Sequence, residues 1–174
     1  MSSLQTVTDL MEIAARTAPK SGGKDFVVVQ VIEGDDLKRL ADEMVKYGEK
    51  TKKKNFDRDA RNVAASPAVM LIGIKDAKSV DLNCGACGFD LCNDRVAVEH
   101  SEFAGPQCAF RVLDMGIALG SAVKTASMLN VDNRIMYRAG VVARQMGLID
   151  ADFVMGIPLS ATGKSIYYDR PPVT

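Results

Sequence analysis

The chain has four cysteines, spaced C-x2-C-x4-C-x15-C: Cys84, Cys87, Cys92 and Cys108. Gly85 and Gly88 stand among the first three, and glycine lets a backbone wrap around a metal centre and expose its amides. Three close thiolates and one distant thiolate are typical of a cubic iron–sulfur cluster. Tetrahedral zinc is the alternative, but zinc ribbons usually bring two C-x2-C pairs and this chain has one. The spacing therefore favours a cluster over zinc.

The rest of the composition agrees with metal binding by reduced cysteines. Residues 1–10 lack a basic segment followed by an apolar run, and no apolar run reaches the roughly 18 residues that cross a bilayer. We therefore expect a cytoplasmic protein whose thiols stay reduced and are not structural disulfides. Twenty-two basic and twenty-two acidic side chains give a formal net charge of zero, so we expect neither nucleic acid nor a membrane as a partner.

The elements that must position the cysteines are predicted from hydrophobic periodicity, and they indicate an α+β fold: a small central β-sheet flanked by helices. We expect strands at 26–32, 68–74 and 153–157, and helices at 4–18, 35–48, 57–66, 110–129 and 132–147, the last capped by Asp132 or Asn133. The whole chain, 1–174, is expected to form one domain, with the cysteine segment 83–108 inserted between the second strand and the long helix.

The long helix at 110–129 predicts a partner. It has few charges, and Gly116 and Gly120 would let another backbone approach closely. A sheet of three strands also leaves apolar surface that a monomer would expose, so we expect a homodimer. The polar tail, 160–174, is expected to add little core and to cross to the partner subunit.

The cysteine run also resembles a known motif. Cys-Gly-x-Cys-Gly-x-x-x-Cys with a distant fourth cysteine is similar to the cluster motif of corrinoid iron–sulfur proteins and of an electron-transport-complex subunit. The resemblance covers about 25 residues around Cys84 to Cys108 and implies a [4Fe-4S] cluster.

Blocks outside the cysteines extend the resemblance over most of the chain: residues 15–20, 114–122, 131–137 and 156–160. Together they resemble an uncharacterised family of small ferredoxin-domain proteins. More remotely, the layout resembles the nitroreductase fold, an α+β homodimer that holds FMN at its interface. That resemblance implies a candidate second cofactor, FMN, which would lie beside the loop from Arg16 to Lys24.

The chain departs from the nitroreductase pattern at the phosphate anchor. Nitroreductases carry an Arg-Arg-Ser element about thirty residues before Ala-Pro-Ser, whereas only seventeen residues precede Ala18 here, and Lys20 replaces the serine. A flavin would have to be held by other side chains, each of which also fits an ordinary surface position: Arg16, Lys20, Ser21, Lys24, Lys164 and Arg170. Gly163-Lys164-Ser165 is not a phosphate-binding loop, because Gly156 is too far before it.

Two functions follow from these patterns. The first is an iron–sulfur redox protein that passes electrons to a partner protein or reduces a small substrate as a nitroreductase-like oxidoreductase. The second is a non-enzymatic iron–sulfur or zinc module, structural or sensing, that binds a protein partner; the lack of an obvious acid–base pair or activated nucleophile in the sequence favours it. Four cysteine ligands fill all four iron positions, which favours electron transfer over Lewis-acid chemistry.

Overall fold

The computed structural model describes residues 3–168, and its centre is a four-stranded antiparallel sheet in the order β1-β2-β6-β5. The strands are β1 (Val27–Glu33), β2 (Ala68–Ile74), β5 (Asp132–Asn133) and β6 (Phe153–Ser160). In the register, Met70 of β2 pairs with Val31 on one side and with Ile157 on the other. Every residue of β2 is buried, which explains why its sequence is continuously apolar and does not alternate.

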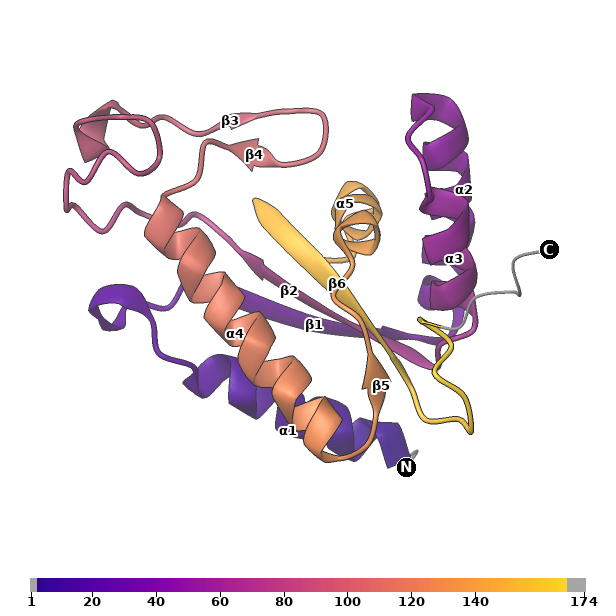
Figure 1. Cartoon of the computed structure of the whole chain (residues 1–174). Coiled ribbons are helices and arrows are strands. Elements are labelled where there is room, and N and C mark those ends of the chain that lie inside the picture. The colour runs from indigo at the N-terminus through magenta and orange to yellow at the C-terminus, as the bar shows by residue number, and fades with distance from the viewer. Residues whose placement is uncertain (1–2, 169–174) are drawn as a thin grey trace.

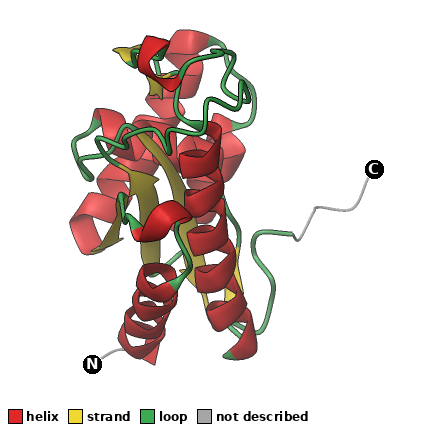
Figure 2. Cartoon of the chain, turned by 90° about the vertical axis from the view of Figure 1, so that its left-hand side faces the viewer, coloured by secondary structure: helices red, strands yellow, loops and turns green. Residues whose placement is uncertain are grey.

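Helices cover both faces of the sheet, as the two orthogonal views show (Figures 1 and 2). They are α1 (Ser3–Thr17) and α4 (Ala109–Met128) on one face, and α2 (Gly34–Thr51), α3 (Phe56–Ala64) and α5 (Tyr137–Gln145) on the other. Within β2, Met70 and Ile72 pack with α1 and α4, while Val69 and Leu71 pack in the core under the other three helices. The period of two along the strand thus supplies two cores.

Glycine allows α5 to lie directly on the sheet. A Cβ atom added to Gly140 would lie 2.2 Å from the carbonyl oxygen of Val154 in β6. One added to Gly156 would lie 2.8 Å from the Cβ of Ala139. A larger residue at either position would push the helix away from the strand.

A long connection between β2 and α4 carries the cysteines. It includes the short helix η2 (Cys92–Asp94) and a hairpin of β3 (Val98–Glu99) with β4 (Ala104–Gly105). It lies at one end of the molecule, above the first turn of α4 (Figure 1). Among residues 3–168, no helix is long and apolar enough to cross a membrane.

The predicted α+β fold, a small sheet flanked by helices, is confirmed, but three details of the prediction are wrong and one hairpin was missed. Asp132 and Asn133 do not cap a helix: they form β5, paired with Ser160 and Leu159, and α5 begins only at Tyr137. The sheet consequently has four strands where three were expected, and the β3–β4 hairpin was not predicted.

The third detail is the tail. Tyr167 is fully buried, and its hydroxyl lies 2.7 Å from Oγ of Ser66 after α3. This part of the tail therefore adds to the core, contrary to the prediction. Residues 169–174 lie outside the described part of the chain, so the predicted crossing to a partner subunit stays a prediction.

Candidate metal centre

All four cysteines lie on the β2–α4 connection and are free thiols. Cys84 is exposed, Cys87 and Cys92 are half-buried, and Cys108 is only 5% exposed, directly before the first residue of α4. Within residues 3–168, no three Cys, His, Asp or Glu side chains are grouped closely enough to hold a metal ion. The donor set fits a cluster of four thiolates or a zinc ion, but gathering the four sulfurs requires the loop to close further.

The first three cysteines lie on a tightly turned backbone. Gly85 and Gly88 have φ values of +70° and +90°, in the left-handed region that other residues rarely adopt. The amide of Gly88 donates to the carbonyl oxygen of Gly85 at 2.9 Å. This turn reverses the chain between Cys84 and Cys87, which confirms the backbone freedom expected of the two glycines.

Asn83 connects the two ends of this turned segment. Its side-chain Oδ1 accepts a hydrogen bond from the backbone amide of Cys92 at 2.8 Å, and the backbone amide of Asn83 donates to Sγ of Cys92 at 3.4 Å. Amide-to-sulfur hydrogen bonds are among the interactions that tune iron–sulfur clusters. Sequence analysis assigned Asn83 no role; its adjacency to Cys84 was the only available signal.

Cys108 has an environment that favours the thiolate. Burial raises the pKa of its thiol, but amide donors from Val80, Arg111 and Phe110 and the positive charge of Arg95 outweigh burial, so that the net effect lowers the pKa. The sulfur also lies at the N-terminus of α4, the positive end of the helix dipole. The thiolate is the form that binds metals.

Arg111 and Asp114, one turn into α4, form a buried ion pair at 3.0 Å. The guanidinium of Arg111 also donates to three carbonyl oxygens, those of Ser21, Lys24 and Lys78. Asp114 accepts hydrogen bonds from the amide and the hydroxyl of Ser21. This buried pair therefore holds two segments against α4: the loop after α1 and the beginning of the connection that carries the cysteines.

The last turn of α1 and the loop after it hold four of the six predicted flavin contacts, and the side chains of three of these four bond within the chain. Arg16 donates to the carbonyl oxygen of Val27 at 2.6 Å, and Lys20 donates to those of Ala15 and Arg16 at the end of α1. Ser21 is bonded to Asp114, whereas Lys24 is exposed.

The other two predicted flavin contacts are not brought to this loop. Lys164 is exposed in the segment after β6, which lies across the molecule from the loop after α1 (Figure 1). Arg170 lies outside the described residues. The structure therefore groups Arg16, Lys20, Ser21 and Lys24, and separates Lys164 from them.

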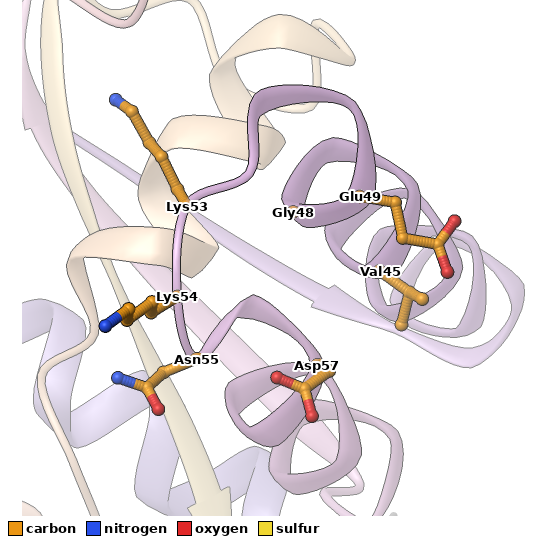
Figure 3. Close-up of a pocket in the computed structure, with 7 residues that line it drawn as sticks. All are labelled: Val45, Gly48, Glu49, Lys53, Lys54, Asn55 and Asp57. Atoms are coloured by element: carbon orange, nitrogen blue, oxygen red, sulfur yellow. The ribbon is translucent and has the colours of Figure 1, made fainter.

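A pocket of ≈ 430 Å³ opens between α2 and α3, with Lys53 and Lys54 on the connection at its edge (Figure 3). Its other lining residues are Val45, Gly48, Glu49, Asn55 and Asp57. None of them belongs to the cysteine segment, so this pocket is separate from the candidate metal centre.

Comparisons with known proteins agree with this architecture. The family described as "Uncharacterized protein containing a ferredoxin domain" (DUF2148) matches residues 104–170, which include Cys108 but not the other three cysteines. A curated protein of Archaeoglobus fulgidus, named only as uncharacterised, is 48% identical over 168 residues, covering 94% of this chain and 89% of its own.

Solved structures similar to this chain include nitroreductases. One from Desulfitobacterium hafniense, with bound FMN, is 14% identical with a TM-score of 0.62, covering 100% of this chain and 84% of its own. Nitroreductase CinD from Lactococcus lactis, in complex with chloramphenicol, is 16% identical with a TM-score of 0.63, covering 94% and 81%. At such identities the similarity establishes a shared fold.

Proposed function

Because the chain belongs to the family of uncharacterised proteins containing a ferredoxin domain, we propose that it binds one [4Fe-4S] cluster and is an iron–sulfur redox protein. The cluster would be held by Cys84, Cys87, Cys92 and Cys108. The observation that carries this proposal is the placement of four free thiols on one connection, one of them, Cys108, at the positive end of the α4 helix dipole. When bound, such a cluster supplies one-electron transfer, since four cysteines occupy all four iron positions.

The residues of the chain itself would favour this chemistry. The backbone amide of Asn83 donates to the sulfur of Cys92, and the amides of Val80, Phe110 and Arg111 stabilise the thiolate of Cys108. Donors of this kind stabilise negative charge on cluster sulfurs. In the cytoplasm, we propose that one electron is taken from a reduced partner protein and delivered to an oxidised protein or small substrate.

Metal analysis of anaerobically purified protein tests the proposal. We expect a brown protein with roughly four irons per chain, and loss of iron in Cys87→Ser and Cys92→Ser, because thiolates hold the cluster. His100→Ala is the control, since His100 is exposed on the same connection and is not a proposed ligand. Stoichiometric zinc without iron would reject the cluster and favour a structural or sensing module.

FMN is a second candidate cofactor, and the nitroreductase fold is the reason to test it. We propose the loop from Arg16 to Lys24 as its site, although Lys20 and Ser21 would have to exchange their present partners for a phosphate. Lys20→Ala should then weaken FMN binding, measured by quenching of flavin fluorescence, without removing iron. If FMN does not bind to the wild-type protein at all, the electron-carrier function remains and the flavin site is rejected.

We also propose a homodimer formed through α1 and α4, which pack against each other. Their outer faces expose apolar side chains: Ile13 is 58% exposed and Leu113 is 61% exposed. Gly116 and Gly120 lie beside Leu113 on the exposed face, with nothing within 4 Å of an added Cβ. Sedimentation at micromolar concentration should give a dimer, and Leu113→Glu should give a monomer; a monomeric wild-type protein would refute this assembly.

A further inference from the structure

The connection that carries the cysteines has two ends that must meet if its four thiols are to share one centre. The first end, from Ala77 to Val80, begins three residues after the end of β2, and the second end reaches Pro106 and Cys108, directly before α4. The turned segment with Cys84 and Cys92 lies between them in the sequence. Cys108 therefore depends on contacts across the connection to lie near the other ligands.

Arg95, three residues after Cys92, makes such contacts with both ends. Its Nε donates to Oγ of Ser79 at 3.1 Å and its Nη2 to the carbonyl oxygen of Ala77 at 3.2 Å. Its Nη1 donates to the carbonyl oxygen of Pro106 at 2.8 Å. One partly buried guanidinium thus joins the beginning of the connection, the segment after Cys92 and the residues before Cys108.

We propose that Arg95 is a positioning residue for the metal centre: it closes the connection by joining its two ends, and it holds the residues before Cys108 against the segment after Cys92, so that a smaller movement gathers the four sulfurs. This inference rests on the proposed function for its consequence, but the closure itself is a property of the metal-free chain. The planar guanidinium presents several donors in a fixed fork, whereas the lysine ammonium is a single point charge. Arginine therefore matches three acceptors from two segments, and lysine does not.

The same side chain also places a positive charge close enough to act on Cys108, since it bonds to Pro106 two residues before that cysteine. Reduction adds one electron to a cluster that four thiolates already make negative, so a nearby fixed positive charge favours the reduced form. Arg95 is thus expected to affect two separate quantities: the order of the connection, through its hydrogen bonds, and the reduction potential, through its charge.

The experiment compares Arg95→Met, Arg95→Lys and Ser79→Ala with wild type and with Arg39→Met. Arg39→Met is the matched control, since Arg39 is 65% exposed in α2 and pairs only with Asp36 among the described residues. Amide hydrogen exchange of residues 77–80 and 104–108 is measured in metal-free protein. Loss of iron to a chelator and the reduction potential are measured after reconstitution with iron and sulfide.

In metal-free protein, Arg95→Met should speed exchange in both segments, and Arg95→Lys should do so nearly as much. Once loaded with iron, Arg95→Met should bind it about 10- to 100-fold more weakly, the range typical of residues that orient metal ligands, and should therefore lose it faster to a chelator. Arg95→Lys should keep the potential near wild type, while Arg95→Met should lower it. A tenfold shift of the reduction equilibrium corresponds to about 59 mV for one electron.

Ser79→Ala removes one of the three hydrogen bonds and leaves the charge, so it should speed exchange modestly without lowering the potential. Unchanged exchange in Arg95→Met would overturn the closure, and unchanged iron loss would overturn its role toward the metal. If the wild-type protein takes up no iron, the proposed function fails, and the exchange measurement still decides whether Arg95 closes the connection.

Discussion

Replacing Arg111 by Met is the sharpest test of how the metal-centre end of the molecule is held together. Arg111 is 1% exposed, and its partner Asp114 is 4% exposed. The substitution leaves the buried carboxylate of Asp114 with the amide and the hydroxyl of Ser21 as its hydrogen-bond donors. It also removes the donor to the carbonyl oxygens of Ser21, Lys24 and Lys78. Breaking one side of a buried ion pair costs about 3–5 kcal/mol.

The quantity to measure is the free energy of unfolding in urea, with all variants at matched metal content. We expect Arg111→Met to lose about 3–5 kcal/mol, a large share of the roughly 5–15 kcal/mol of a typical domain. Asp114→Asn keeps an acceptor for Ser21 and should lose less, about 1–3 kcal/mol. Since the two residues share one network, the double variant should lose less than the sum of the single variants.

Arg39→Met serves again as the control, because a surface ion pair contributes only about 0–1 kcal/mol. If Arg111→Met costs no more than Arg39→Met, the buried pair does not hold the two loops to α4. Hydrogen exchange of Arg111→Met distinguishes local from global destabilisation. We expect faster exchange in the loop after α1 and in the first residues of the cysteine connection.

Two further predictions concern the opposite helix layer. Burial raises the pKa of Glu102, but hydrogen bonds from Lys53, Tyr137 and Tyr47 outweigh it and hold the pKa below its ordinary value of 4.5. The stabilisation from ionised Glu102 is fully present above the ordinary pKa and is lost as the pH falls through the lowered pKa. Between about pH 5 and about pH 3, the free energy of unfolding of Glu102→Gln should therefore fall less than that of the wild-type protein. An equal decline in both proteins would contradict the assignment. Gly140→Ala should cost about 3 kcal/mol in the same urea assay, because its Cβ would lie 2.2 Å from the carbonyl oxygen of Val154. Gly163→Ala, with nothing within 4 Å, should stay within about 0.5 kcal/mol, and equal effects of the two substitutions would show that α5 shifts freely on β6.

Sequence analysis was most successful where the pattern is local. The apolar run of β2 and the helical period of α4 predicted the bounds of both elements to within about a residue. Burial of a strand, or of one helix face, requires apolar residues at a regular spacing, and that spacing is visible in the sequence. It failed at Asp132 and Asn133, whose side chains suit a helix cap. There the edge of β6 was available for pairing, and the partners of Asp132 and Asn133 in that strand, Ser160 and Leu159, lie well over twenty residues later in the chain.

The same distinction divides the candidate metal centre. The cysteine spacing and the two glycines alone determined which residues are the candidate ligands and where the backbone turns, because both are properties of adjacent residues. Only the tertiary structure decided which polar residues hold that segment in place: Arg95 bonds to Ala77 and Pro106, and Arg111 bonds to Ser21, 90 positions earlier in the chain. The sequence does not distinguish an arginine that is a surface charge from one whose buried guanidinium bonds to several carbonyl oxygens. The partners come from distant segments that only the fold brings together, so they leave no periodic signal in the sequence.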